Sequence, residues 1–324
     1  MINVVVTGGL GFIGSNLIEL LIKKKFNVIN IDKESYSSNF YNTKNFSNSS
    51  NYKFIKCDLN ENLKLKKIIL KHRPRCIFNL AAETHVDRSI ESPKNFIESN
   101  ILGVFNLLEI FKEYSKKYNK SRLIHVSTDE VYGDIINGRS DENYKYQPSS
   151  PYAASKASSD HLVSSYFKTY KIPVIITNCS NNYGPKQHDE KLIPTIIRKA
   201  LSGEQIPIYG DGKNIRDWLY VLDHCKGIEL VYKIGKTGET YNIGGKNERD
   251  NLYIVDIICG VLDKIIPKET SYKEQISFVT DRSGHDFRYA INASKIENKL
   301  EWKAEENFET GIKKTIEWYL KKYR

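Results

Sequence analysis

The sequence predicts an α/β fold, in which a doubly wound parallel sheet is followed by a smaller α+β lobe. Short apolar runs that suit buried strands alternate with amphipathic helical segments, which is typical of a parallel sheet covered by helices on both faces. A glycine-rich turn, residues 7–14, joins the first of these strands to the first helix. The chain has 324 residues, which is enough for a large core and two lobes.

The composition is that of a soluble globular protein, with 40% hydrophobic and 27% charged residues. No apolar run approaches the roughly 18 residues of a membrane span, and the N-terminus leads directly into a strand, which argues against a signal peptide. The five cysteines form no Cys-x-x-Cys pair, and their spacings suit neither zinc nor disulfides. We therefore expect reduced thiols, no metal, no membrane contact and a cytoplasmic location.

The net charge of +10 comes mostly from lysine. Lysine clusters at 23–25, 116–117 and 321–322 lie near expected helix ends, where the helix dipole favours cations, so they indicate solvated faces. The sequence has no basic stripe with interleaved aromatic residues. We therefore expect no nucleic acid partner.

Taken in chain order, the apolar patterns predict six strands for the first lobe, at 2–6, 27–31, 52–57, 76–80, 122–126 and 173–177. The principal helices are expected at about 15–25, 93–117, 191–202 and 308–322. The helix at 93–117 carries an apolar face that suits either the core or a dimer surface, and this face contains Ile101, Val104, Phe105, Leu108 and Phe111.

A dinucleotide-binding fingerprint occupies residues 2–32, where a strand, a glycine turn, a helix, a second strand and an acid follow one another. This is the order of a Rossmann-type unit. Gly8, Gly11 and Gly14 allow the backbone to approach a pyrophosphate, which the helix N-terminus can bind. The Asp32 carboxylate can accept hydrogen bonds from ribose hydroxyls and would repel a 2′-phosphate, so we predict NAD rather than NADP. The alternative is a tight turn without a ligand.

The next two strands end in residues suited to a cofactor. One leads to Asp58, which could contact an adenine amino group or cap the helix that begins near Asn60. The other leads into Ala81 and Ala82, whose small side chains would let a cofactor lie close. His85 follows, and a lone histidine is more often packed or hydrogen-bonded than catalytic.

A polar group follows the strand at 122–126, where residues 127–133 read Ser-Thr-Asp-Glu-Val-Tyr-Gly. Ligands bind at the carboxyl ends of the strands in an open parallel sheet. Asp129 and Glu130 are adjacent carboxylates, and their surroundings can make one an acid and the other a base. We therefore expect the chemistry at this strand end.

Tyr152 and Lys156 are four residues apart, but the same Tyr-x-x-x-Lys spacing occurs three more times in the chain, so the spacing alone carries little weight. The setting of this pair is specific, because Ser149 or Ser150 can cap a helix and Pro151 suits its first turn. Positions i and i+4 share a helix face. Together with a cationic nicotinamide, the Lys156 ammonium can then lower the pKa of the Tyr152 phenol from about 10.

The second half of the chain is less regular. Arg216 and Arg282 could each bind a diphosphate with the two prongs of the guanidinium, or each could form a surface ion pair. We expect residues 1–177 to form an NAD-binding domain to which 216–243 return, and residues 178–324 to form mainly a substrate-binding domain.

Eight motifs make the chain similar to the extended short-chain dehydrogenases/reductases, and specifically to nucleotide-sugar 4,6-dehydratases of the dTDP-glucose type, over nearly its full length. They are TGGLGFIGS (7–15), AAETHVDRS (81–89), STDEVYG (127–133), YAASK (152–156), NCSNNYGP (178–185), EKLIP (190–194), IRDWLYV (215–221) and TDRSGHDFRYAI (280–291). The Asp-Glu pair is the specific part. Related 4-epimerases and UDP-glucuronate decarboxylases lack it, and GDP-mannose 4,6-dehydratases keep the glutamate alone and favour NADP.

The resemblance implies a reaction on the glucose of dTDP-glucose or UDP-glucose. Tyr152, as a phenolate, takes the proton of the O4 hydroxyl, which Thr128 hydrogen-bonds, while hydride leaves C4 for NAD. The new ketone acidifies C5, so Glu130 removes the C5 proton and Asp129 protonates the C6 hydroxyl, which leaves as water. Hydride returns to C6 and Glu130 reprotonates C5. The product is a 4-keto-6-deoxy sugar of the kind used in deoxysugar biosynthesis, including that of rhamnose.

The resemblance also implies a set of binding residues and a homodimer formed through the helices around 93–117 and 152–170. Catalysis is assigned to Thr128, Asp129, Glu130, Tyr152 and Lys156. The cofactor contacts are Gly8, Gly11, Phe12, Ile13, Gly14, Asp32, Lys33, Asp58, Leu59, Leu80, Ala81, Ala82, Ser99, Tyr152, Lys156 and Asn182. The substrate contacts are Thr84, Asn181, Lys191, Leu192, Pro207, Ile208, Tyr209, Arg216, Asn251, Arg282 and His285.

Two departures from the family pattern and two rival functions accompany this reading. Ser283 replaces the usual proline after the arginine of the late loop, which would loosen that loop. The segment 33–39 differs from the pattern expected in bacterial enzymes, which leaves the choice between thymine and uracil open. The rivals are an NAD-dependent nucleotide-sugar 4-epimerase, against which the Asp-Glu pair argues, and a non-catalytic NAD-binding regulatory protein, against which Tyr152 and Lys156 argue.

Overall fold

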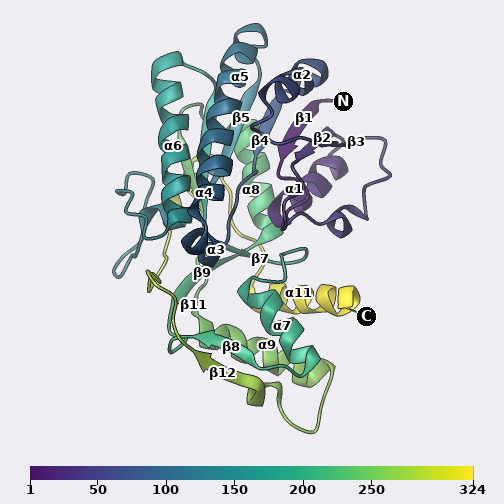
Figure 1. Cartoon of the computed structure of the whole chain (residues 1–324), viewed down its shortest axis with the longest axis vertical. Helices are drawn as coiled ribbons and strands as arrows, with labels where there is room; N and C mark the ends of the chain where they lie inside the picture. Colours follow the sequence, from purple (N-terminus) through teal and green to yellow (C-terminus); the bar gives the residue numbers. More distant parts are fainter. Residues whose placement is uncertain (324) are drawn as a thin grey trace.

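A seven-stranded parallel sheet forms the centre of the larger lobe in the computed structural model, which describes residues 1–323 (Figure 1). The strands lie in the order β10-β6-β5-β4-β1-β2-β3, and every neighbouring pair is parallel. Their bounds are Asn3–Thr7 (β1), Asn27–Asp32 (β2), Tyr52–Lys56 (β3), Cys76–Asn79 (β4), Arg122–Thr128 (β5), Val174–Cys179 (β6) and Thr240–Ile243 (β10). The predicted Rossmann-type doubly wound sheet is therefore confirmed.

Helices cover both faces of this sheet, because its strands are apolar on both sides. One face packs against α1 (Phe12–Lys23) and α8 (Val221–Ile234), and the other packs against α2 (Asn62–His72), α5 (Gly103–Lys117) and α6 (Pro151–Tyr170). The strand order reverses between β1 and β4, and the crevice beyond the carboxyl ends at such a point is where open α/β sheets bind ligands.

The long helix expected at 93–117 is helical throughout but changes its winding. It consists of α4 (Pro93–Phe96), a π-helical stretch at Ile97–Leu102, and α5. Part of the predicted apolar face enters the core, since Val104, Leu108 and Phe111 are buried, while Phe105 is 42% exposed. Most of the predicted apolar face thus packs in the core, while its edge at Phe105 lies at the surface.

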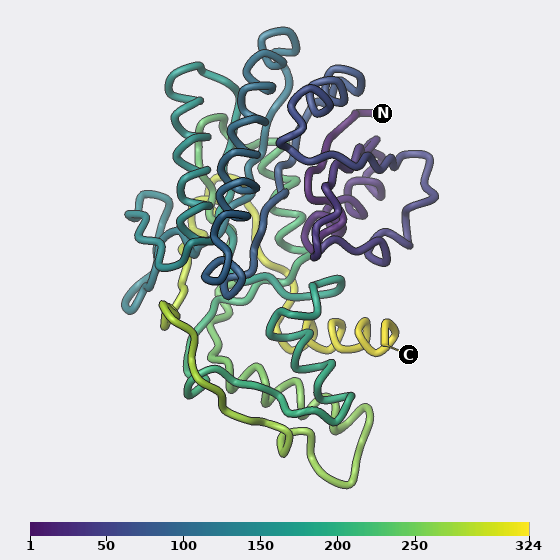
Figure 2. The backbone as a smooth tube through the Cα atoms, viewed as in Figure 1, coloured from purple at the N-terminus to yellow at the C-terminus, as the bar shows by residue number. Residues whose placement is uncertain are grey.

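The smaller lobe is built around two short sheets, and Figure 2 shows its chain below the large sheet. One sheet has the order β11-β9-β7 and the other pairs β12 with β8. Their bounds are Asn181–Tyr183 (β7), Ile206–Tyr209 (β8), Ile215–Tyr220 (β9), Glu248–Asp250 (β11) and Ile276–Val279 (β12). A separate apolar core joins α7 (Leu192–Ser202), α9 (Asn251–Ile265) and α11 (Phe308–Tyr323). Two shorter helices complete the fold, α3 (Val86–Glu91) and α10 (Ser294–Leu300).

The chain passes back into the larger lobe through α8 and β10. Helix α8 packs against α1, and β10 extends the large sheet beside β6, whereas β9 pairs with β7 and β11 in the smaller lobe. We propose to keep the division at residue 177, with the return of 216–243 carried by α8 and β10.

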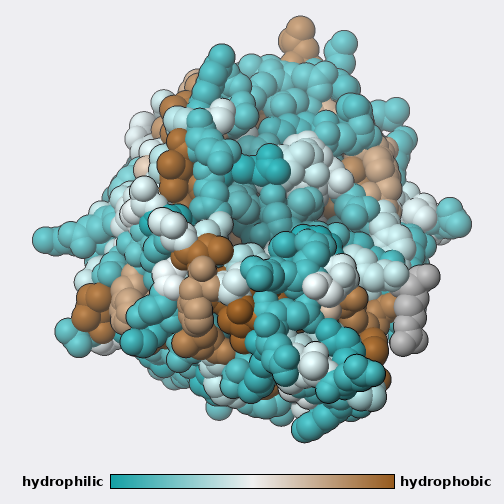
Figure 3. Space-filling model, turned by 60° about the horizontal axis from the view of Figure 1, so that its bottom comes forward, coloured by the Kyte–Doolittle hydropathy of each residue, from teal (hydrophilic) through white to brown (hydrophobic). Residues whose placement is uncertain are grey.

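The surface in Figure 3 is largely hydrophilic, with hydrophobic side chains gathered in a few patches. Most lysines of the three predicted clusters are exposed. All five cysteines are free and buried, as expected for reduced thiols. Within residues 1–323, no helix is long and apolar enough to cross a membrane.

Candidate active site

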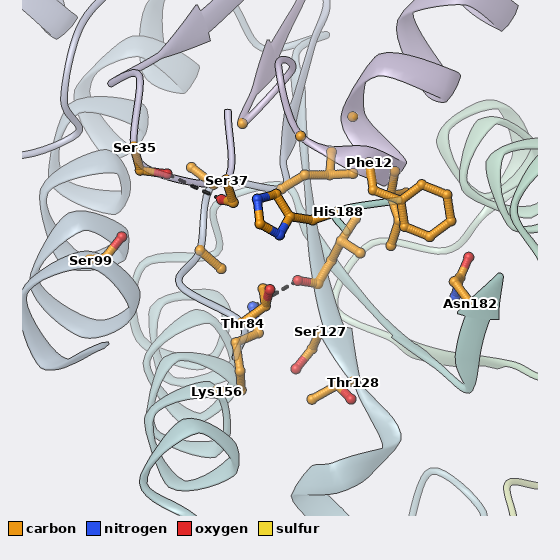
Figure 4. Close-up of a pocket in the computed structure, with 18 of the residues that line it drawn as sticks. Phe12, Ser35, Ser37, Thr84, Ser99, Ser127, Thr128, Lys156, Asn182 and His188 are labelled. Carbon is orange, nitrogen blue, oxygen red and sulfur yellow. Dashed lines mark hydrogen bonds between the residues drawn. The ribbon is translucent and has the colours of Figure 1, made fainter. Parts of the chain in front are cut away.

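A cavity opens at the carboxyl ends of β1, β2, β4, β5 and β6, where the sheet meets the smaller lobe. Figure 4 shows Phe12 from α1, Ser127 and Thr128 from β5, Lys156 from α6 and Asn182 from β7 around this space. Every residue predicted to contact the cofactor lines the cavity, and so do all five predicted catalytic residues. Residues from both lobes therefore meet at the switch point of the sheet.

The glycine turn packs so closely against neighbouring backbone that side chains would clash there. Gly8 has a φ of +71°, and a Cβ added there would lie 2.8 Å from the backbone nitrogen of Ala81. A Cβ on Gly14 would lie 2.3 Å from the Gly8 carbonyl oxygen. Gly11 precedes α1 and makes no side-chain cap, so the helix N-terminus keeps free N–H groups. These features fit the pyrophosphate of a dinucleotide.

Asp32 is fixed at the end of β2 by the turn that follows it. One carboxylate oxygen, Oδ2, accepts a hydrogen bond from the Leu10 N–H at 3.0 Å. The other, Oδ1, accepts from the Glu34 N–H at 2.8 Å and from the Ser38 hydroxyl at 2.7 Å. The carboxylate is thus held rigidly on the cavity wall, where it can meet a ribose.

Several cavity residues were missed by the sequence analysis, namely Ser35, Ser37, Ser38, Gln187 and His188. The serines belong to the polar segment after Asp32 that the composition predicts only as a loop, and Ser35 and Ser37 are hydrogen-bonded to each other at 3.2 Å (Figure 4). The signal that could have found them is their position directly after the strand end that carries the acid.

Asp58 and His85 both accept hydrogen bonds from the backbone close to them in sequence. Asp58 lines the cavity, and its carboxylate accepts from the Asn60 N–H at 2.9 Å, while the N-cap of α2 is Glu61. Asp58 therefore stabilises the turn before the helix and still faces the cofactor space. His85 caps α3, where its Nδ1 accepts from the Arg88 N–H at 3.4 Å, so it is hydrogen-bonded as expected.

Asp129 is a buried carboxyl group in the centre of the site, with 3% of its surface exposed. Its Oδ1 accepts a long hydrogen bond from the Thr128 hydroxyl at 3.4 Å, and its Oδ2 is buried without a partner. Burial, followed by the neighbouring charge of Glu130, raises the pKa of Asp129 well above its ordinary value. This shift favours the protonated form of Asp129, and its Oδ2 has no hydrogen-bond partner within residues 1–323.

Glu130 lies next to Asp129 but has different surroundings. Burial raises the pKa of Glu130, and the cations of Lys191, Arg282 and Arg216 oppose this shift in that order. A carboxyl beside three cations ionises more readily than one that faces other acids. Burial thus raises the pKa of both carboxyls, while nearby cations favour ionisation of Glu130 more than that of Asp129.

Tyr152 and Lys156 stand on the first turns of α6, as predicted. Ser150 is the N-cap, its hydroxyl accepts from the Ala153 N–H at 3.1 Å, and Pro151 occupies the first turn. The ammonium of Lys156 donates to the Val126 carbonyl at 2.8 Å.

The electrostatics of Tyr152 differ from what the helix spacing predicts. Burial and then the charge of Glu130 raise the pKa of Tyr152 well above its ordinary value, while the Thr128 hydroxyl opposes this. A phenolate at Tyr152 requires a lowered pKa. This lowering therefore depends on positive charge from a bound nicotinamide in addition to that of Lys156.

The predicted substrate residues fall into two groups. Thr84, Asn181 and Lys191 line the cavity, and Lys191 donates to the Thr84 carbonyl at 2.8 Å. The remaining residues lie outside the cavity wall, in the smaller lobe, and they are Leu192, Pro207, Ile208, Tyr209, Arg216, Asn251, Arg282 and His285. Ile208 is 1% exposed as a whole residue, so neither its side chain nor its main chain offers much surface to a ligand.

The two arginines are held in different ways. Arg216 is buried and donates to the carbonyls of Ile215, Asp286 and Phe287 at 2.7–3.2 Å, so it is not a surface ion pair. Arg282 is 3.4 Å from the Asp87 carboxylate and 3.0 Å from His285 Nε2. Both cations lower the pKa of Glu130, which places their charge at the site.

Comparison with known proteins identifies the family. The family model described as GDP-mannose 4,6 dehydratase matches residues 5–315. The dTDP-glucose 4,6-dehydratase of Salmonella typhimurium is 50% identical over 98% of this chain and 92% of its own. The chain belongs to the dTDP-glucose 4,6-dehydratase family. It is an NAD-dependent enzyme of the lyase class, as the Asp-Glu pair in a dinucleotide cavity predicts.

Two solved structures of this family share the fold. The dTDP-glucose 4,6-dehydratase of Bacillus anthracis, in complex with NAD, has a TM-score of 0.89 and 44% identity, covering 99% of this chain and 97% of its own. The Streptomyces venezuelae enzyme, with NAD and dTDP bound, has a TM-score of 0.92 and 38% identity with the same coverage.

Within residues 1–323, no group of three or more His, Cys, Asp or Glu side chains is arranged to bind a metal ion. Asp129, Glu130 and Tyr152 all line one cavity.

Proposed function

We propose that this protein converts dTDP-D-glucose to dTDP-4-keto-6-deoxy-D-glucose, with UDP-D-glucose as the alternative substrate. The observation that supports this most directly is the pair of adjacent carboxyls Asp129 and Glu130, which have different charged neighbours and line one NAD-type cavity with Tyr152. The relatives named dTDP-glucose 4,6-dehydratase favour thymidine. Thymine and uracil differ by one methyl group, whose contact in an apolar pocket is worth about 1–3 kcal/mol, so this contact sets the preference for the base.

The first step is removal of the O4 proton by Tyr152. Thr128 is placed to hydrogen-bond O4, because it stands at the end of β5 beside Asp129 and lowers the pKa of Tyr152. The glycine turn and Asp32 would hold NAD, which would supply the acceptor for the C4 hydride and the donor of hydride to C6. Lys156 supplies positive charge near the phenol, since it lies on the same face of α6.

The second step is loss of water across C5 and C6. The 4-ketone acidifies the C5 proton, which Glu130 removes as general base. The raised pKa of Asp129 favours its protonated form and its Oδ2 has no partner within residues 1–323, so Asp129 can give a proton to the departing C6 hydroxyl. Glu130 then returns the proton to C5. Glu130 is thereby restored, whereas Asp129 has lost the proton that leaves with water and Tyr152 has gained the O4 proton. One proton must therefore pass from Tyr152 to Asp129, through solvent, before the next turnover.

The third element of the proposal is the binding of the diphosphate. Arg216, Arg282 and Lys191 bring cations to the side of the cavity that faces the smaller lobe, and all three act on Glu130. Arg282 has an Nε atom that is buried without a partner. We propose that Arg216 and Arg282 meet diphosphate oxygens, while Thr84, Asn181 and Lys191 contact the sugar; the other predicted contacts would line the nucleoside.

We also propose a cytoplasmic homodimer. The cytoplasmic location is supported by five free, buried thiols. The dimer is supported by the apolar side chains of Ile97, Leu102 and Phe105, which are 42–50% exposed along the helices that precede and form α5.

The test is mass spectrometry of the purified protein incubated separately with dTDP-glucose and UDP-glucose. Loss of one water from either, without added reductant, is the expected result, and the relative rates identify the base. The 4-epimerase alternative predicts an unchanged mass with a changed sugar configuration. An unchanged substrate in both incubations would contradict the proposal and favour a non-catalytic NAD-binding protein.

A further inference from the structure

A buried carboxylate, Asp160, lies behind the catalytic strand end and has no part in the chemistry described above. It stands on α6 one turn after Lys156 and is 1% exposed. Its Oδ2 accepts from the Ser127 hydroxyl at 2.8 Å, the Tyr146 hydroxyl at 3.2 Å and the Asn178 amide at 3.4 Å. One oxygen thus ties α6 to β5, to β6 and to the loop that precedes α6.

These bonds reach the catalytic residues through the backbone. Ser127 lines the cavity directly before Thr128, and Asn178 also donates to the Thr128 carbonyl at 3.1 Å. The end of β5 is therefore held from behind by Asp160 and Asn178 together. A loosened strand end would displace Thr128 and Asp129, and misplacement of about 1 Å can cost a hundredfold in rate.

The other oxygen of Asp160 faces a histidine that does not neutralise it. Asp160 Oδ1 is 3.3 Å from His125 Nε2 and has no hydrogen-bond partner of good geometry. His125 Nδ1 lies 3.0 Å from the Asn79 amide nitrogen, so Nδ1 is the acceptor and the ring is neutral with its proton on Nε2. Burial and the charge of Lys156 lower the pKa of His125, in agreement with this state.

Lys156 is the cation that needs a counter-charge. Its side chain is buried at 4% exposure, its ammonium donates to the Val126 carbonyl, and it forms no ion pair within residues 1–323. Burial lowers the pKa of Lys156, and the charge that opposes this most is that of Asp160, one helical turn away. A neutral Lys156 would offer no positive charge to Tyr152.

We propose that Asp160 is a positioning residue of this active site, which anchors the end of β5 through Ser127 and keeps Lys156 an ammonium. This inference rests on the roles proposed above for Tyr152 and Lys156. The titratable groups that face Asp160 are His125 from β5, Tyr146 from the preceding loop, Tyr132 from the turn after β5, and Lys156 from its own helix.

The experiment compares Asp160→Asn with Tyr146→Phe in the full chain. The asparagine keeps the size of the side chain but removes its charge, whereas Tyr146→Phe removes one hydrogen bond to the same oxygen and keeps the charge. We expect Asp160→Asn to lower kcat about 10–100-fold at neutral pH, to move the alkaline limb of kcat at least one pH unit lower, and to leave KM and bound NAD nearly unchanged. Tyr146→Phe should change kcat by less than about threefold and leave the limb in place.

The outcomes separate this inference from the proposed function. If the wild-type protein dehydrates the substrate but the alkaline limb of kcat does not move in Asp160→Asn, only the role of Asp160 is overturned. The same holds if the alkaline limb moves equally far in Tyr146→Phe. No dehydration by the wild type would overturn the proposed function first. If Asp160→Asn does not fold, Asp160→Glu keeps the charge and shifts the carboxylate. Asp160→Glu should lower kcat but keep the alkaline limb of kcat at the wild-type pH. A displaced alkaline limb in this variant would contradict the proposal.

Discussion

The two sides of the cavity are built in different ways. The cofactor side is the rim of one sheet, where β1, β2, β4 and β5 end side by side and each strand end carries its own contact residue. The substrate side is assembled from Lys191 before α7, from β9 and from the loop after β12, and β9 and this loop hold each other. Arg216 binds the carbonyls of 286 and 287, and Arg282 binds Asp87 and His285. We therefore expect a single substitution to reduce ligand binding more on the cofactor side than on the substrate side.

The largest effect is expected at the border between the two sides, from Tyr152→Phe. The phenyl ring keeps the packing of α6 but cannot take the O4 proton. We expect turnover to fall about 10²–10⁴-fold, the usual contribution of a general base, with NAD still bound. Product formation and the NAD content of the purified protein are the two measurements. Turnover within tenfold of the wild type would remove Tyr152 from its proposed role.

Glu130→Gln should be nearly as damaging but should stop the reaction later. Oxidation at C4 needs only Tyr152, whereas removal of the C5 proton needs the Glu130 carboxylate. We therefore expect the absorbance of reduced nicotinamide to accumulate on the protein when sugar nucleotide is added, with little loss of water. Glu142→Gln is the matched control, because Glu142 binds the Asn242 N–H outside the cavity wall. Rapid dehydration by Glu130→Gln would show that another base acts at C5.

The same contrast explains how far the sequence could predict the site. Residues such as Gly8, Asp32 and Ala81 follow predicted strands directly, and the ends of parallel strands meet at one edge, so their convergence follows from strand order. The partners of Arg216 and Arg282 come from segments some 70 and 195 residues away in sequence, and no local pattern connects them.

Features set by residue type were predicted better than features set by burial. The cap at Ser150 follows from residue type alone, and it was predicted as one of two serines. The π-helical stretch at Ile97–Leu102 and the raised pKa of Tyr152 depend on surroundings from other parts of the fold. Ser35, Ser37 and Ser38 were missed because a polar loop carries no periodic signal.

Asp32→Ala tests the cofactor side alone. The alanine would remove the acceptor for the ribose and also free the Leu10 and Glu34 N–H groups and the Ser38 hydroxyl. Hydrogen bonds to a charged group contribute about 1.5–3 kcal/mol, so NAD affinity should fall about 10–150-fold. Calorimetric titration with NAD measures this. Glu34→Ala is the control, since Glu34 lies in the same turn outside the cavity wall, and an equal loss there would indicate a general loosening of the turn.

Arg282→Lys tests the substrate side and should have the smallest effect. Lysine keeps the charge but loses the two-pronged geometry, and Lys191 and Arg216 still supply cations to the same region. The side chain of Arg282 is 25% exposed and already shares its charge with Asp87, so we expect a loss of about 1 kcal/mol, or a rise in KM of about fivefold with kcat nearly unchanged. Arg198→Lys, on an exposed ion pair with Glu204, is the matched control and should leave KM unchanged. A rise in KM larger than the loss of NAD affinity in Asp32→Ala would reverse the comparison. It would mean that one arginine, rather than a set of cations, carries the binding of the diphosphate.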